Sequence, residues 1–210
     1  MKKLLFVLAL LVGFGSTSFA QVNKQLEKAK EKQTKEKLKE LKKDGWKIDA
    51  SINTLEVAYL EFYEKLNSKD YKAIVGTTSN CISTNVCRQV CFNNACIDYA
   101  GKANSSVEGK VNSLNTANSS EGTAEVDKTI SAYTRYVQAS IKGVLTEGFA
   151  LVRKTGDVKE YRIFYLVNEK EAEEVRTRAM QKAIRETKLA TDDARKIEEF
   201  VKEGFPTENQ

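Results

Sequence analysis

The chain contains a single proline, Pro206, which lies close to its C-terminus. Proline removes a backbone donor and clashes with the preceding turn, so it is the residue that most often breaks a helix. Its absence before residue 206 favours long uninterrupted helices. It also argues against a β-sandwich, whose many short strands are joined by turns rich in glycine and proline.

The first twenty residues have the organisation of a secretory signal peptide. A basic start, Met1–Lys3, precedes an apolar run over residues 4–14, and Ser18-Phe19-Ala20 forms a small-x-small cleavage site. We expect cleavage after Ala20 and export to the periplasm, the outer envelope or the medium. No cysteine stands at the cut for acylation, and the run is too short to span a bilayer. We therefore expect no transmembrane segment after cleavage, which leaves peripheral contact with a membrane open.

Composition predicts one ordinary core and no nucleic-acid partner. Apolar residues make up 41% of the chain, which suits one domain with helical additions. The net charge is +5, and it falls to +3 when the leader removes Lys2 and Lys3. This excess is too small to indicate binding to nucleic acid or to an anionic membrane.

The chain contains no histidine, which excludes many familiar active sites. Histidine is the usual general base near neutral pH, the base of nucleophilic triads and the commonest metal ligand. The sequence also lacks GxSxG, a phosphate-binding glycine loop and a calcium loop. Most of the 29 acidic residues stand in lysine-rich helical stretches, which is typical of a solvated face. We expect no catalytic residues and no cofactor.

Residues 21–68 are predicted to form an N-terminal helical region. Ten lysines between Lys24 and Lys47 leave only a thin apolar stripe, which indicates a mostly exposed helix over 22–44 that ends at Asp44-Gly45. A basic arm that touches lipopolysaccharide or an acidic partner is the alternative. Ser51 is the predicted cap of a second helix that runs to about Leu66. Its expected core face is Ile52, Leu55, Tyr59, Phe62 and Leu66.

Residues 69–168 are predicted to form an α+β core domain. Alternation over 71–78 indicates a strand, and a helical period then runs from about Asn85 with small residues on its buried side. The expected buried stripe is Cys87, Cys91, Ala95, Tyr99, Ala103, Val107, Val111 and Leu114. A polar loop over 112–122 leads to a helix over 123–142.

A β-hairpin follows, with strands at 144–153 and 158–167 around Lys154-Thr155-Gly156-Asp157. Both faces of its second strand are partly apolar, so we expect each face to be covered. Residues 169–203 predict a long charged helix that spans about 50 Å if unbroken. It either bends near Thr191-Asp192-Asp193 or projects to pack on another chain.

The one cluster of side chains in the sequence that could form disulfides or bind a metal is that of the four cysteines, Cys81, Cys87, Cys91 and Cys96. Their spacings lack the CxxC pair of zinc knuckles and redox motifs, so metal binding is the least favoured interpretation. In a continuous helix, residues four apart hold their Cβ atoms about 5–6 Å apart, too far for a disulfide. Only Cys81, in the preceding loop, can reach Cys87 without breaking the helix. We favour small core residues, with a disulfide between Cys81 and Cys87 as the main alternative.

The order of these elements resembles the lipoprotein-20-like family of bacterial envelope proteins. The likeness covers residues 71–167, and the segment 41–47, LKKDGWK, is similar to a lead-in of secreted proteins of Bacteroidota. It rests on Thr77-Thr78-Ser79, Ala95, Ala100, Ala103, Phe149-Ala150-Leu151 and Tyr161-Arg162-Ile163. The resemblance implies an envelope protein without an active site, although the chain lacks the acylated cysteine of the lipoprotein members.

Together these features predict an α+β fold with an antiparallel sheet of about three strands, packed with long helices. The predicted function is noncatalytic binding or assembly outside the cytoplasm, with a protein partner that is either a second copy or another envelope protein. A disulfide, thiol-redox or metal-binding protein centred on residues 81–96 is the alternative. An enzyme that uses Asp or Glu acid–base pairs is the least favoured.

Overall fold

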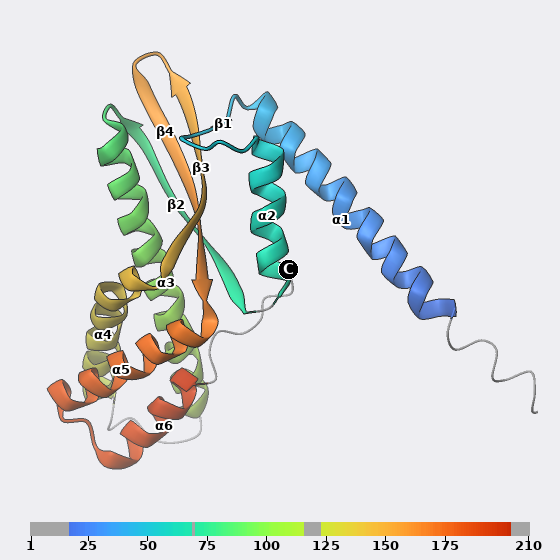
Figure 1. The fold of residues 1–210 in the computed structure, drawn as a ribbon. Coiled ribbons are helices and arrows are strands. Elements are labelled where there is room, and N and C mark those ends of the chain that lie inside the picture. The colour runs from blue at the N-terminus through green and yellow to red at the C-terminus, as the bar shows by residue number, and fades with distance from the viewer. Residues whose placement is uncertain (1–16, 69, 116–122, 203–210) are drawn as a thin grey trace, which may run out of the picture. The chain divides into compact units, whose positions relative to one another are not determined.

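The computed structural model describes residues 17–68, 70–115 and 123–202 (Figure 1). The chain has an α+β fold in which helices pack on a four-stranded antiparallel sheet, as the sequence predicted. It divides into two compact units, Met1–Trp46 and Lys47–Gln210, so the second unit holds the whole sheet. In the part of the chain that the structure describes, none of the helices has the length and apolar character needed to cross a membrane.

The first unit contains helix α1 (Thr17–Lys43). It carries the pairs expected of a solvated helix, among them Lys35 with Glu31 at 4.0 Å and Lys37 with Glu40 at 2.9 Å. Gly45 follows at φ +80°, the left-handed conformation that closes a helix without steric cost, so the predicted helix end is confirmed. Most of the predicted signal peptide lies outside the described residues, and its last four residues form the first turn of α1.

The second unit is organised around strands β1 (Lys47–Ile48), β2 (Tyr71–Cys81), β3 (Leu145–Thr155) and β4 (Val158–Asn168). They lie in the order β1-β3-β4-β2, and every neighbouring pair is antiparallel. The predicted hairpin is β3–β4, which turns at Gly156 with φ +64°. The two-residue strand β1 was not predicted, because two residues show no alternation. β2 extends past its predicted end at Thr78, through a register shift, to Cys81.

Helix α3 (Thr84–Asn115) covers one face of the sheet. It approaches β2 so closely that a Cβ atom on Gly76 would lie 1.9 Å from the Cys91 carbonyl oxygen. Apart from Leu114, whose burial is not described, the predicted stripe from Cys87 to Val111 is buried. The helix continues to Asn115, four residues into the stretch that was predicted as a loop. Residues 116–122 lie outside the described part of the chain.

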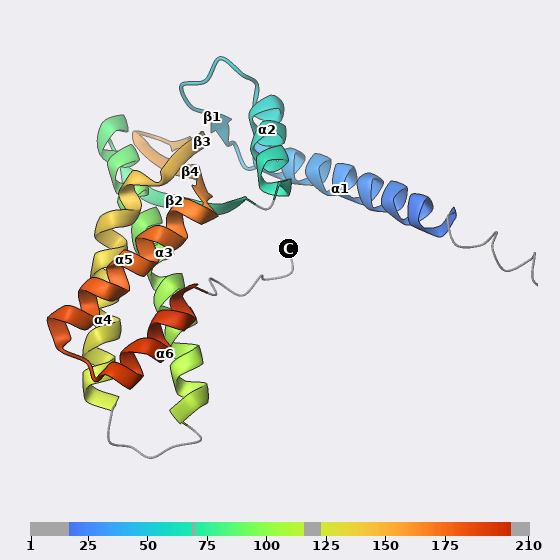
Figure 2. The same cartoon turned by 60° about the horizontal axis from the view of Figure 1, so that its bottom comes forward.

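Helix α2 (Leu55–Asn67) covers the opposite face, as Figure 2 shows. Phe149 and Phe164 stack with ring centroids 4.3 Å apart, and Phe62 meets both rings edge-on at 5.4 and 5.8 Å. Gly148 makes room for this contact, since a Cβ atom there would lie 2.3 Å from the Phe62 ring. The expectation that each face of the hairpin is covered is therefore confirmed.

The start of α2 differs from the prediction. Thr54 caps the helix by accepting a hydrogen bond from the Val57 N–H at 3.4 Å, whereas Ser51 accepts from the Asn53 N–H within the preceding turn. Ser51 and Thr54 are both good capping residues. The helix begins after Thr54 because Leu55 is the first side chain that reaches the core. Ile52, which the periodicity assigned to the core, is consequently fully exposed.

The remaining helices extend the core beyond the sheet. Helix α4 (Thr123–Ser140) and the short 3-10 helix η1 (Ile141–Gly143) pack on α3. The predicted C-terminal helix is two helices, α5 (Glu169–Thr187) and α6 (Thr191–Lys202), both of which contact other helices (Figure 1). The break lies at Lys188, whose φ is +57°, and α6 begins at the predicted capping sequence. The bend is therefore confirmed, and Ala190 is exposed in the break.

Candidate functional site

The structure joins Cys81 and Cys87 by a disulfide, with Cα atoms 5.6 Å apart. Cys81 is the last residue of β2 and Cys87 lies in the first turn of α3, so the bridge closes the short connection between the two elements. The left-handed residue Asn80 (φ +61°) and the register shift in β2 form the end of the strand. The bridge fastens the strand to the helix that covers it.

Cys91 and Cys96 are free thiols with no solvent exposure. The Cys91 thiol donates to the Tyr161 carbonyl oxygen at 3.7 Å. Burial raises the pKa of Cys91 to about 11, against a lowering by Arg88 and with a further rise from Glu147. Burial also raises the pKa of Cys96. Because the thiolate is the nucleophile and the metal ligand, both side chains act here as small core residues.

The four candidate residues therefore divide into a bridge and two packed thiols. All four are buried and within one segment, but the structure gives them no shared reactive centre. Among the described residues, no group of three or more Cys, Asp or Glu side chains is placed to hold a metal ion.

Arg88 forms an ion cluster beside these cysteines. Its guanidinium donates to Asp49 at 3.0 Å and to both carboxylate oxygens of Glu147 at 2.6 and 2.7 Å. Burial alone would lower the pKa of Arg88, but the two carboxylates raise it by more. The cluster connects α3 with β3 and with the segment after β1, and its geometry suits fastening of the sheet to the helix.

Arg176 is the centre of a second, deeper cluster that the sequence analysis missed. The residue is 2% exposed, and its guanidinium donates to the Tyr99 hydroxyl at 2.5 Å and to Glu169 at 2.9 Å. Glu169 also lies 3.6 Å from the ammonium of Lys72. Burial raises the pKa of Tyr99 to about 12, although Arg176 acts in the opposite direction. The position of Arg176 in the alanine stripe of α5 is the signal that could have found it.

Tyr133 lies close to this cluster without joining it. The residue has no solvent exposure, and its hydroxyl has no hydrogen-bond partner among the residues that the structure describes. Burial raises its pKa, while the charge of Arg176 lowers it. The Arg176–Tyr99 hydrogen bond links α5 to α3, and Tyr133 of α4 lies beside it.

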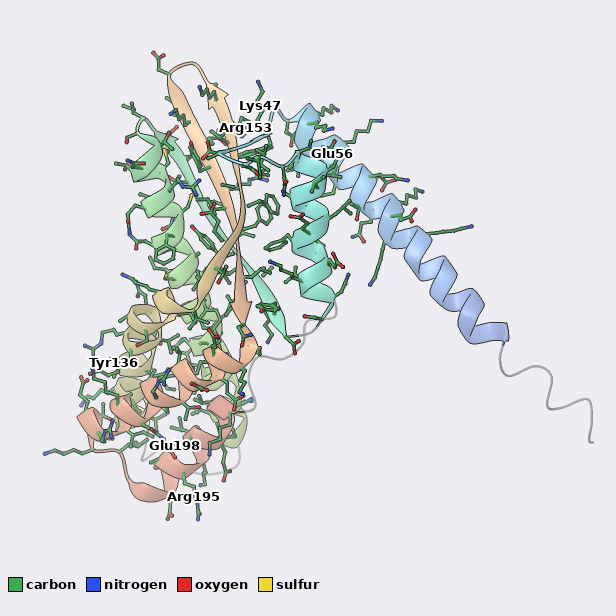
Figure 3. The ribbon with its side chains drawn as sticks, in the orientation of Figure 1. Lys47, Glu56, Tyr136, Arg153, Arg195 and Glu198 are labelled. Carbon is green, nitrogen blue, oxygen red and sulfur yellow. A yellow bond between two sulfur atoms is a disulfide. The ribbon has the colours of Figure 1, made fainter. Side chains whose placement is uncertain are left out.

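A surface cluster joins α4 and α5 around Tyr136, which Figure 3 labels. The Tyr136 hydroxyl donates to Glu186, and Arg135 lies 2.9 Å from the same carboxylate. The Lys182 ammonium stands 4.2 Å from the centre of the Tyr136 ring. The Tyr136 hydrogen bond, followed by Arg135, lowers the pKa of Glu186. These residues pair with one another across two packed helices, which is a structural role.

Large exposed apolar side chains gather in two places within the described residues. The first comprises Ile52 before α2 and, on α2, Val57, Leu60 and Tyr63, which we call the α2 patch. The second, the α3 surface, comprises Ile82, Val86, Val90 and Ile97, of which Val90 is partly buried. Spacings of four, three and four through residues 86, 90, 93 and 97 keep these positions on one side of the helix.

The α3 surface belongs to a stretch that is almost free of charge. Residues 71–97 include only two charged side chains, Lys72 and Arg88, in a chain that is 30% charged. Lys72 is paired with Glu169, and Arg88 with two carboxylates. The low charge of this stretch is visible in the sequence, but which of its side chains are exposed is set by the fold.

Neither protein-family models, nor curated proteins, nor solved structures give a match to this chain.

Proposed function

We propose that the chain is an exported, noncatalytic protein of the periplasm or envelope that acts by binding or assembly. The observation that carries the proposal is the α3 surface, where Ile82, Val86 and Ile97 are 80%, 56% and 52% exposed. Exposed apolar side chains that follow one side of a helix suit an interaction site. Their neutral surroundings favour a protein partner over a polyanion.

The cysteines support the export part of the proposal. A disulfide such as Cys81–Cys87 persists in oxidising compartments and is rare in a reducing cytoplasm. The alternative, a thiol or metal protein centred on residues 81–96, has less support, because Cys91 and Cys96 are buried and their pKa values are raised. The resemblance to the lipoprotein-20-like family also favours an envelope role.

Export is tested by the mass of the chain in a bacterial host. We expect the protein released from the periplasm to begin at Gln21. The variant Ala20→Phe removes the small residue that the peptidase requires and should retain the leader. An unmodified chain that keeps its leader and stays in the cytoplasm would contradict the proposal.

Contact is tested by cross-linking in intact cells. We expect an adduct of defined mass that Ile97→Glu removes, because a carboxylate would have to be desolvated in the contact. The matched control is Leu60→Glu, which places the same charge on the α2 patch, where Leu60 is 55% exposed. A chain that gives no adduct of defined mass would refute a role in binding or assembly.

A further inference from the structure

The positive charge of the chain without its leader is concentrated before the sheet. Residues 21–46 hold nine lysines and five acidic residues, a net charge of +4, whereas the chain from Gln21 onward carries +3 in all. The second unit, Lys47–Gln210, therefore has a net charge of −1. The small overall excess hides this asymmetry, which indicates one basic surface on α1.

Most of the lysines of α1 lie on one side of this uninterrupted helix (Figure 1). Six exposed residues, which we call the lysine stripe, are Lys28, Lys32, Lys35, Lys39, Lys42 and Lys43. Their spacings of four, three, four, three and one keep them within about 100° around the helix axis and along roughly 22 Å of its length. Lys30 and Lys37 lie on the opposite side, and the buried Leu38 and Leu41 lie outside the stripe.

The charge of the stripe is available to a ligand. A shallow groove along α1 is lined by Lys28, Glu31, Lys32, Lys35, Glu36 and Lys39. Glu36 lies 3.9 Å from the ammonium of Lys32. Glu31 lies 4.0 Å from that of Lys35. All four of these side chains are at least 68% exposed, so both pairs are weak and screened by water.

The chemistry of the stripe excludes three other kinds of ligand. Protein interfaces are anchored by aromatic and arginine side chains at their centre, whereas the stripe consists of lysine alone. A free phosphate ion would meet only one or two of six cations spread over roughly 22 Å. Nucleic acid carries the same phosphate charge, but the export that we propose would separate the chain from it.

A membrane surface that contains anionic lipids fits the stripe. Its phosphate headgroups lie in a plane, which a helix contacts along one row of side chains, and lysines near such a plane bind through charge. By helical position, Glu31 and Glu36 border the stripe on its two sides, so only this row presents unbroken positive charge. The stripe has no apolar side chain, so α1 would rest on the headgroups without insertion.

We propose that the lysine stripe binds the phosphate headgroups of an anionic membrane, with α1 parallel to the membrane surface. This contact goes beyond the proposed binding or assembly through the α3 surface. It rests on the proposed function only for the export that brings the chain to the lipids of the envelope.

Co-sedimentation of the purified mature chain with lipid vesicles tests the contact. We expect binding to vesicles of phosphatidylcholine mixed with the anionic lipid phosphatidylglycerol, and none to phosphatidylcholine alone. An increase in salt from about 0.1 M to about 1 M should release the chain, because the Debye length falls from about 10 Å to about 3 Å.

Two double variants of equal charge separate the stripe from the rest of α1. Lys28→Gln with Lys39→Gln should weaken binding to the anionic vesicles by roughly tenfold or more, because both lysines face the headgroups. The matched control, Lys30→Gln with Lys37→Gln, should change binding by less than about threefold, since these side chains lie about a helix diameter farther from the membrane. All four lysines are exposed and glutamine suits a helix, so both variants should fold.

Absence of binding, equal binding to neutral and anionic vesicles, or equal losses in the two double variants would overturn the proposal. Tighter binding to duplex DNA at the same phosphate concentration would assign the stripe to nucleic acid instead. Release by inorganic phosphate beyond that by chloride at equal ionic strength would assign it to the free ion. The proposed function fails separately, if no adduct forms in cells.

Discussion

Two buried tyrosines near Arg176 differ in whether the hydroxyl has a partner. Tyr99 accepts a hydrogen bond from the Arg176 guanidinium, whereas the Tyr133 hydroxyl has no hydrogen-bond partner among the described residues. A buried hydroxyl without a partner has lost its hydration and gains no hydrogen bond in return. A buried charge whose partner is removed is left with neither hydration nor that hydrogen bond.

Phenylalanine substitutions should therefore have opposite effects at these two sites. We expect Tyr99→Phe to lower the free energy of unfolding by about 1.5–3 kcal/mol, the value of a hydrogen bond to a charged group. Tyr133→Phe should be neutral or stabilising by up to about 1 kcal/mol, since it removes only an unpaired hydroxyl. Urea denaturation of the two variants measures both. Equal losses of stability would show that the two hydroxyls do not differ in this way.

The number of cysteines that react with an alkylating reagent should differ between the native, the denatured and the denatured and reduced chain. The native chain should take up no label, because Cys91 and Cys96 are buried and protonated near neutral pH. Denaturation without reductant should expose these two thiols, and reduction should then release Cys81 and Cys87. Intact mass spectrometry records each addition. Labelling of Cys91 in the native chain would contradict its role in the core.

The residues that sequence reasoning could identify are those that follow a period. The buried stripe of α3 is regular, and the continuity of that helix left Cys81 and Cys87 as the pair able to form a bridge, which is the pair that the structure joins. Arg176 could not be found from hydrophobic pattern alone, because its charge is satisfied by Tyr99 and Glu169 from elsewhere in the chain. Such partners are set by tertiary packing.

β2 packs closely against α3. Gly76 allows it, and the carbonyl of Cys91 occupies the space where any other residue would place its Cβ atom. The disulfide and the Asn94 hydrogen bond hold the same two elements together at other points. The edge strand and its covering helix therefore act as one mechanical unit.

Alanine substitutions should reveal this contact. Gly76→Ala should destabilise the chain by about 1–3 kcal/mol or more, because backbone atoms must move apart to admit the methyl group. Gly101→Ala, which lies on α3 and has no atom within 4 Å of the added Cβ, should stabilise by about 0.5–1 kcal/mol. Thermal unfolding followed by circular dichroism compares the two. A tolerated Gly76→Ala would mean that β2 and α3 do not lie this close.

Elements with long regular patterns were predictable, whereas the start of α2 was not. α3, α4 and the β3–β4 hairpin lie close to the predicted bounds, since each has a sustained period and a recognisable turn. The start of α2 depends on whether Ser51 or Thr54 caps the helix. The residue that caps the helix is the one just before the first side chain that packs into the core.

At the scale of the molecule, the features that distinguish the chain lie on the surface around its edge strand. The Arg88 cluster and the Cys81–Cys87 bridge fasten the sheet to α3, and buried Arg176 links α5 to α3. The α3 surface stands on the helix that covers the edge strand β2. Sequence reasoning predicted assembly but not this surface, because an edge strand is defined only by the strand order of the finished sheet.

The most direct test of a role in binding or assembly is native mass spectrometry of the protein isolated from the cell envelope. Dissociation of the complex in the instrument then gives the mass of each chain. The account predicts a complex of at least two chains, each beginning at Gln21 and each two hydrogens lighter than the fully reduced chain because of the Cys81–Cys87 bridge. A monomer of the full-length chain with four free thiols would contradict export, bridge and assembly at once.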